Sequence, residues 1–221
     1  MNNNAYILFT RVPVPNKVKT RLQSMLSGEE ACQVQLSILK DSFTKFTDLP
    51  NKGIDLYLAY SDEGDSSTLL SELPSIFQPF QQKGTTIGER MNYAIETVFS
   101  RGYEKVVLTG SDIPNLTSQK IYSAFEQMKE VVFGPSLDGG YYLVGCKQSI
   151  DLTPIFEKTI SWGENMVLNE SLKQLKTVHV AFLPYLQDID HPGDLKKIRY
   201  ELESENQHLS RWIKENRGLF E

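Results

Sequence analysis

Asp112 follows a short run of apolar and β-branched residues, Val106 to Thr109, and the breaking pair Gly110-Ser111. Such a run is typical of a buried parallel strand. Open α/β sheets bind their ligands just beyond the carboxyl ends of their strands, and this aspartate is expected there. An aspartate that only caps a turn would fit the stretch about as well, so the other polar stretches have to decide.

Positive charge gathers directly after another apolar run, at 5–9. The four cations of this segment are Arg11, Lys17, Lys19 and Arg21. Cations held so close together repel one another, and a phosphate or pyrophosphate would relieve that repulsion. A solvated basic loop is the plainer interpretation and is usual for such runs. Either way, the segment follows a strand and is expected at the same sheet edge as Asp112.

A glycine- and tyrosine-rich stretch, 134–145, contains Asp138 followed by Gly139, Gly140 and two tyrosines. Glycines permit close approach of the backbone to a ligand, and the tyrosines could flank a sugar or a base. A simple hairpin turn is the alternative, because Asp-Gly is a strong turn dipeptide. The two interpretations are compatible.

Asp188 and Asp190 flank Ile189 shortly before Pro192. In an extended segment alternate residues face the same way, so the two carboxylates could converge. Hard oxygen ligands suit Mg²⁺ or Mn²⁺, which proteins often bind through one or two carboxylates plus substrate phosphates. Alternatively, one aspartate caps the helix that Pro192 opens and the other is solvated.

Two further stretches carry weaker signals. Thr86 and Glu89 have the spacing of a capping box, and the free amides of a helix start can hold a base edge or an anion. A capping box without a ligand is the plainer interpretation. The stretch 161–164 places Trp162 before a helix, as a sugar-stacking surface or as a core plug.

Alternating strand and helix patterns are expected to position these stretches. Strands are expected at 5–9, 54–60, 106–109, 131–133, 141–146 and 178–183. Helices are expected after Ser27, Thr86 and Thr117, across 168–175 and after Pro192, and the polar segment 61–84 is expected to hold a short helix and a loop. This alternation predicts one domain, 1–221, with a mostly parallel sheet covered on both faces and an antiparallel element near 131–146.

The composition and the motifs that the sequence lacks exclude several classes of protein. A formal net charge of -5 argues against a general nucleic-acid binder. No stretch is long enough for a membrane span, and no signal-peptide pattern opens the chain, so a cytoplasmic protein with reduced cysteines is expected. The P-loop, the dinucleotide fingerprint G-x-G-x-x-G and the nucleophile elbow G-x-S-x-G are all missing.

Taken in order, these stretches resemble the bacterial glycosyltransferase-like proteins that are associated with radical-SAM enzymes and arsenosugar biosynthesis. The matching motifs are F-T-R-V-P-V-P-N-K-V-K-T-R-L at 9–22, G-E-R-M at 88–91, G-S-D-I-P at 110–114, D-G-G-Y-Y-L at 138–143, W-G at 162–163 and D-I-D-H-P at 188–192. The resemblance implies a Rossmann-like α/β/α sandwich of the nucleotide-diphospho-sugar transferase (GT-A) type. The molybdenum-cofactor nucleotidyltransferases and phospholactate guanylyltransferases look like close structural relatives.

The resemblance also implies roles for single residues. Asp112 resembles a metal-binding carboxylate, Asp190 or Asp188 resembles a second one, and the implied metal is Mg²⁺ or Mn²⁺. Nucleotide binding is expected at Arg11, Lys17, Lys19, Arg21, Gly88, Glu89, Arg90, Gly139 and Gly140. The chain departs from the family at Asn16, where glycine is frequent, at Ser161, where proline is common, and in having a single aspartate instead of a D-x-D motif.

Three functions are compatible with this sequence. The first is transfer of a sugar from a nucleotide-diphospho-sugar to a small-molecule acceptor, with Asp138 as the base that activates the acceptor hydroxyl. The second is nucleotidyl transfer from a nucleoside triphosphate to a phosphorylated acceptor, with release of pyrophosphate. The third is non-catalytic binding of a nucleotide sugar. No membrane or nucleic-acid partner is expected, and the oligomeric state is left open.

Overall fold

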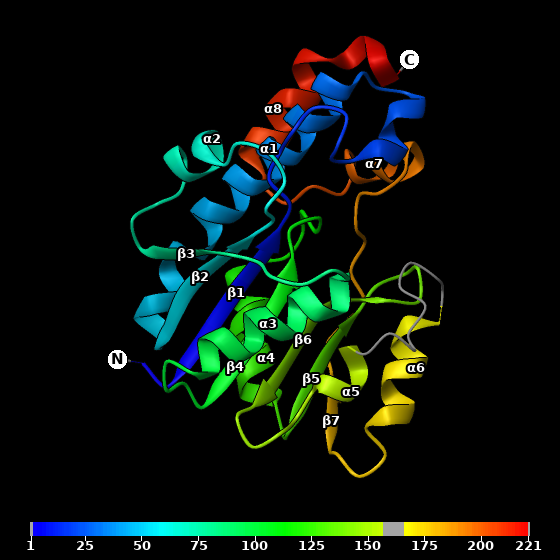
Figure 1. Ribbon diagram of the computed structural model, residues 1–221. Helices are drawn as coiled ribbons and strands as arrows, with labels where there is room; N and C mark the ends of the chain where they lie inside the picture. Colours follow the sequence, from blue (N-terminus) through cyan, green and yellow to red (C-terminus); the bar gives the residue numbers. More distant parts are fainter. Residues whose placement is uncertain (1, 157–165, 221) are drawn as a thin grey trace.

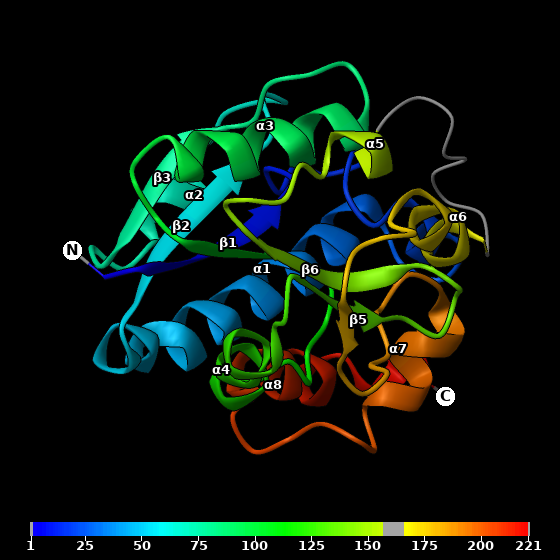
Figure 2. The ribbon, with the colours of Figure 1, turned by 90° about the horizontal axis from the view of Figure 1, so that it is seen from below.

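The computed structural model describes residues 2–156 and 166–220 and contains a seven-stranded sheet between helices (Figures 1 and 2). The strands are β1 (Asn4–Thr10), β2 (Ile54–Tyr60), β3 (Phe77–Gln81), β4 (Lys105–Gly110), β5 (Val131–Pro135), β6 (Tyr141–Lys147) and β7 (Val180–Phe182). Their order is β3-β2-β1-β4-β6-β5-β7. Only β6 runs antiparallel to its neighbours β4 and β5. The predicted α/β fold with a mostly parallel sheet is therefore confirmed.

Helices cover both faces of the sheet, as Figure 2 shows. The helices are α1 (Gly28–Lys45), α2 (Ser67–Ser71), α3 (Ile87–Phe99), α4 (Ser118–Gln127), α5 (Thr153–Phe156), α6 (Val167–Gln174), α7 (Pro192–Ile198) and α8 (Gln207–Glu215), with short 3₁₀ turns η1 (Thr20–Ser24), η2 (Phe46–Lys52) and η3 (Arg217–Phe220). Apolar residues of α1 and α4 form one core with the sheet, and those of α3, α5 and α6 form a core on the opposite face. Each strand in the centre therefore buries side chains on both sides, which explains its nearly continuous apolar sequence.

A third apolar cluster lies outside these two layers and joins the ends of the chain. Leu22 of η1 and Ile38 of α1 pack there with Leu195 of α7 and Trp212 of α8. Ile189, which lies between the two predicted metal-side aspartates, is fully buried in the same cluster. The cationic segment and the Asp188–Asp190 segment are thus held by common packing.

The helix starts follow the predicted capping chemistry. Ser27 and Glu30 form a capping box at α1, and Thr86 and Glu89 form one at α3. The hydroxyl of Thr117 accepts a hydrogen bond from the amide of Lys120 at 3.3 Å and so caps α4. These caps satisfy backbone donors that the first helical turn leaves unpaired.

Some predicted boundaries were wrong. The segment 61–84 contains the helix α2, as expected, but it also contains the edge strand β3, which pairs with β2. Pro79 and the exposed polar residues of β3 hide the strand pattern, and an edge strand tolerates both. The last strand, β7, is shorter than predicted. The predicted stretch 161–164 lies outside the described residues.

Within the described residues, none of the helices combines the length and the apolar composition that a membrane crossing requires.

Candidate functional site

The carboxyl ends of β1 and β4 lie side by side, because Phe9 pairs with Gly110 in a parallel register. Three adjoining pockets open at this edge. The apolar pocket, of about 270 Å³, is lined mainly by Phe9, Ile87, Met91, Leu108, Tyr141 and Val144, together with Asp112, Asp138 and Asp188. The cationic pocket, of about 370 Å³, is lined by Arg11, Lys19, Arg21, Asp112 and Asp190 among others. The acidic pocket, of about 490 Å³, is lined by Arg21, Asp138, Asp188, Asp190 and Asp194 among others.

Lys19 and Asp112, which are far apart in the sequence, meet in the cationic pocket. The Nζ atom of Lys19 lies 2.9 Å from Oδ1 of Asp112, and the Lys19 side chain is only 3% exposed. The same ammonium donates a hydrogen bond to the carbonyl of Ile189, and the amide of Ile189 donates to the carbonyl of Asp112 at 3.0 Å. The three segments are therefore tied together at one point, and the cationic segment lies at the same sheet edge as Asp112, as expected from the sequence.

The backbone of the cationic segment adopts a conformation that favours few residue types. Asn16 and Lys19 have φ angles of 63° and 50°, in the left-handed region. Asparagine tolerates this region better than most residues, which explains how Asn16 can stand where the family often has glycine. Residues held in this region tend to occur at functional sites, where the surrounding structure enforces them.

The remaining predicted cations fall into two groups. Arg21 forms an ion pair with Asp190 at the mouth of the cleft, and Lys17 is exposed, with no carboxylate pairing with it in the described part of the chain. Arg11 pairs with Glu63, and Arg90 pairs with Asp62 at 3.1 Å. These last two cations thus fix the loop after β2, and Arg90 does not line the cleft pockets described above.

The Gly88–Arg90 stretch serves mainly the start of α3. Glu89 accepts a hydrogen bond from the amide of Thr85 at 2.7 Å, and Gly88 is buried within the first helical turn. Ile87, directly before it, reaches the apolar pocket and is 47% exposed. A role of this stretch in nucleotide binding stays a prediction.

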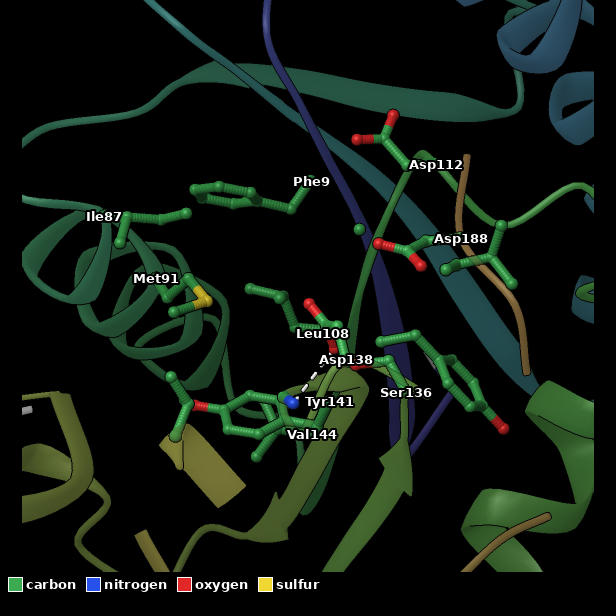
Figure 3. Close-up of a pocket in the computed structure, with 15 residues that line it drawn as sticks. Phe9, Ile87, Met91, Leu108, Asp112, Ser136, Asp138, Tyr141, Val144 and Asp188 are labelled. Carbon is green, nitrogen blue, oxygen red and sulfur yellow. Dashed lines mark hydrogen bonds between the residues drawn. The ribbon is translucent and has the colours of Figure 1, made fainter. Parts of the chain in front are cut away.

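Asp138 both shapes a turn and faces the cleft. Its Oδ1 atom accepts hydrogen bonds from the hydroxyl of Ser136 and from the amide of Gly140, the latter at 3.0 Å (Figure 3). Gly139 has a φ angle of 88°, which favours glycine. The predicted hairpin turn therefore exists, and the aspartate of this turn also lines the apolar pocket.

Asp188 lies beside Asp138 in the same cleft, and the side chains of both residues line the apolar and the acidic pockets. Burial, followed by the negative charge of Asp138, raises the pKa of Asp188 to about 6. Asp188 therefore carries a proton more readily than an ordinary aspartate does.

The carboxylates of the cleft can hold a divalent ion only if a ligand shares it with them. Among the described residues, no group of three or more histidine, cysteine, aspartate and glutamate side chains can hold a metal ion. The Asp112 side chain is 45% exposed, and Lys19 pairs with its Oδ1 atom. Asp112, with Asp190 or Asp188, therefore fits an ion that is shared with ligand phosphates, not one that the protein encloses.

Asp112 is held in place by residues that were not identified from the sequence. The side-chain amide of Gln35, which is 3% exposed on α1, donates to the hydroxyl of Ser111 at 2.9 Å. That hydroxyl lies 3.4 Å from Oδ1 of Asp112. Lys45, further along α1, donates to the carbonyl of Pro114 at 2.5 Å, and burial lowers the pKa of Lys45 to about 8. The sequence feature that could have identified Gln35 is its position between Val34 and Ile38, on the apolar face of the helix.

Comparisons with known proteins agree with this fold. The 2-phospho-L-lactate guanylyltransferase of Methanocaldococcus jannaschii is 30% identical over 189 residues, which cover 83% of this chain and 77% of that protein. A crystal structure from Desulfovibrio desulfuricans G20, provisionally described as a nucleotide-diphospho-sugar transferase, is 28% identical, with a TM-score of 0.90 and coverage of 100% of this chain and 97% of that one. The nucleotide-diphospho-sugar transferase fold is thereby confirmed.

A cytidylyltransferase from Leptospira borgpetersenii shares the fold at 13% identity, with a TM-score of 0.55 and coverage of 100% of this chain and 97% of that one. This structure supports the fold alone, whereas the guanylyltransferase relative supports a transferase. A family model described as an uncharacterized protein conserved in bacteria matches residues 47–164. With just over half of its length matched, the chain belongs to this family, DUF2064.

Proposed function

We propose that the protein is a nucleotidyltransferase, which moves a nucleotidyl group from a nucleoside triphosphate to a small-molecule acceptor and releases pyrophosphate. The observation that carries the proposal is the meeting of Lys19 and Arg21 with Asp112 and Asp190 at one sheet edge. Such a set of charges suits a polyphosphate and a bridging divalent ion. The guanylyltransferase relative, at 30% identity, favours nucleotidyl transfer over sugar transfer, which reverses the order given by the sequence.

In the proposed reaction an acceptor oxygen forms a bond to the α-phosphorus of the donor. The bond from that phosphorus to the oxygen bridging to the β-phosphorus breaks, and pyrophosphate leaves. Lys17, Lys19 and Arg21 stabilise the negative charge that develops on the leaving group. The acceptor proton passes to a cleft carboxylate, for which Asp138 is the candidate. Mg²⁺ or Mn²⁺, held by Asp112 with Asp190 or Asp188, would neutralise phosphate charge when bound.

Sugar transfer from a nucleotide-diphospho-sugar is the second candidate. It is favoured by the Desulfovibrio desulfuricans structure, whose TM-score of 0.90 is higher than that of the cytidylyltransferase, 0.55. In that reaction the same charged edge would stabilise a departing nucleoside diphosphate. The association with radical-SAM enzymes and arsenosugar biosynthesis stays a prediction within this second candidate.

A panel of nucleotides, followed by product analysis, tests the proposal. Nucleoside triphosphates and sugar nucleotides are added at millimolar concentration, with and without Mg²⁺ or Mn²⁺, and the melting temperature is recorded, because a ligand of the native state raises it. We expect a triphosphate to give the largest rise and to yield pyrophosphate with an acceptor. Free nucleoside diphosphate from a sugar nucleotide would instead establish the second candidate.

Two variants complete the test. Asp112→Asn should abolish turnover, whereas Glu126→Gln, a change at an exposed carboxylate of α4, should leave turnover unchanged. Binding without turnover that also survives Asp112→Asn would indicate a non-catalytic binding protein. If no nucleotide changes the melting temperature, the proposal fails.

A further inference from the structure

The apolar pocket differs in charge from the cationic pocket beside it. Asp112, Asp138 and Asp188 line the apolar pocket, and among its described lining residues there is no lysine, arginine or histidine. In the view of Figure 3, Asp138 and Asp188 lie beside the apolar side chains, and Asp112 lies at the upper margin of the same space. The divalent ion of the proposed function would neutralise Asp112 when bound. A ligand in this pocket therefore meets apolar surface and the carboxylates of Asp138 and Asp188.

The nearest cations are on the other side of Asp112 and are already paired. Lys19 lies against Asp112, Arg21 against Asp190 and Arg11 against Glu63. All three cations line the cationic pocket. Arg21 also lines the acidic pocket, and the charge of Lys19 acts on Asp188. Under the proposed function these cations also face the phosphates of the donor, so the carboxylates outweigh them in the apolar pocket.

The other wall of the apolar pocket offers hydrophobic surface that the fold leaves uncovered. Ile87, at the first turn of α3, is 47% exposed although it lines the pocket. Phe9 and Met91 extend the same wall, and Tyr141 closes it on the β6 side (Figure 3). An apolar group of a ligand would remove this surface from water, which favours binding.

We propose that the acceptor is a hydroxyl-bearing molecule with an apolar part and with neutral or positive charge, and that it carries neither phosphate nor carboxylate. This inference rests on the proposed function, because it assigns the apolar pocket to the acceptor. An anionic acceptor would add like charge next to Asp138 and Asp188, and like charges in a partly buried site disfavour binding. The chain thus differs from its relative, whose name specifies the anionic 2-phospho-L-lactate.

A matched set of acceptors tests the inference. Pyrophosphate release from the best-binding triphosphate is measured with 2-phospho-L-lactate, L-lactate, L-lactamide, propane-1,2-diol, 3-phenoxypropane-1,2-diol and choline. We expect the phenoxy diol or choline to give a kcat/KM at least about tenfold above that of 2-phospho-L-lactate. If no neutral or cationic compound exceeds 2-phospho-L-lactate, the inference is wrong.

Charge-reversal variants provide a second, independent measurement. Because Asp138 is also the candidate base, acceptor binding is compared instead of turnover. Asp138→Lys should shift the ratio of acceptor dissociation constants toward 2-phospho-L-lactate by at least about tenfold, whereas Glu126→Lys makes the same change in net charge on α4, away from the cleft, and should leave the ratio unchanged. Asp138→Asn should shift the ratio in the same direction by a smaller amount if the lysine variant does not fold. An unchanged ratio in the folded Asp138 variants would contradict the inference.

The apolar wall is tested separately. Ile87→Ser should lower kcat/KM for 3-phenoxypropane-1,2-diol more than for propane-1,2-diol, because only the first compound has a ring to bury. Equal effects on the two diols would place the apolar part of the acceptor elsewhere. These outcomes are distinct from a failure of the proposed function. Efficient use of 2-phospho-L-lactate would preserve nucleotidyl transfer and remove only the inference, whereas no triphosphate binding would remove both.

Discussion

The two halves of the cleft are built in different ways. In the cationic half, side chains from distant segments are cross-linked, with Lys19 joining Asp112 to the backbone of Ile189. In the apolar half, Asp138 is held by its own turn, through Ser136 and the amide of Gly140. The first half depends on tertiary packing, and the second depends on a local hairpin. Substitutions in the cationic half should therefore disturb the stability of the whole protein together with the chemistry, whereas those in the apolar half should act mainly on the chemistry and the selectivity of the site.

The largest effect is expected at Asp112. Asp112→Asn keeps the shape of the side chain but removes the charge that faces Lys19 and, in the proposed reaction, the donor phosphates, so kcat should fall by at least about 100-fold. Pyrophosphate release at saturating triphosphate measures the loss, and Glu126→Gln serves as control. Activity within about threefold of the parent protein would show that the cationic half is not the reaction centre.

Lys19→Met, compared with Lys17→Met, distinguishes the structural role of the Lys19 contacts from the effect of positive charge alone. The Ile189 carbonyl loses the hydrogen bond that it accepts from Lys19, so the free energy of unfolding should fall by about 1–3 kcal/mol. Loss of the positive charge beside Asp112 should also lower kcat by about 100-fold. Urea unfolding and turnover measure the two quantities. Lys17→Met, at an exposed cation of the same segment, should change stability by less than about 0.5 kcal/mol. Equal stability losses in the two variants would contradict the comparison.

Gln35→Leu should produce an intermediate effect. The change removes the donor to Ser111 below Asp112, so Asp112 is held less firmly and kcat should fall by about tenfold. The apparent affinity for the divalent ion should fall as well, which a titration of activity with Mg²⁺ measures. Ser37→Ala, on the same helix, should affect neither quantity. If Gln35→Leu lowers only the stability and leaves the Mg²⁺ dependence of activity unchanged, the role of Gln35 is structural.

The smallest effect is a pH dependence in the apolar half. The pKa of Asp188 is about 6 in the folded protein and about 3.9 in an unfolded chain. Between these values the folded state binds more protons, so this group makes the free energy of unfolding fall as pH rises from about 4 to about 6. Asp138→Asn should weaken that fall, because it removes one negative charge. Urea unfolding at several pH values in EDTA measures the slope, and an unchanged slope would show that Asp138 does not act on Asp188.

The sequence predicted those parts of the fold and of the cleft that are encoded locally. The apolar runs of the central strands, the capping boxes at Ser27 and Thr86 and the turn at Asp138 all depend on neighbouring residues. The meeting of Lys19 with Asp112 was also anticipated, because parallel strands end at one edge. The strand β3 was missed, because its pairing with β2, and not its own composition, makes it a strand.

The missed parts of the cleft depend on contacts between distant segments. The partners of Arg11 and Arg90 are Glu63 and Asp62, in a loop whose path the sequence does not determine. The apolar wall was missed for a related reason. Ile87 and Phe9 have the sequence pattern of ordinary core residues, and only the arrangement of α3 against the sheet leaves them facing a pocket. Roles for these residues in binding stay predictions.

The third apolar cluster has a consequence for biosynthesis. Leu22 and Ile38 find their partners in Leu195 and Trp212, more than 150 residues later in the chain. A ribosome adds about 5–20 residues per second, so the segment that contains Lys19 waits many seconds for the helices that pack against it. During translation the packing around the cationic segment is therefore incomplete until α7 and α8 have been made.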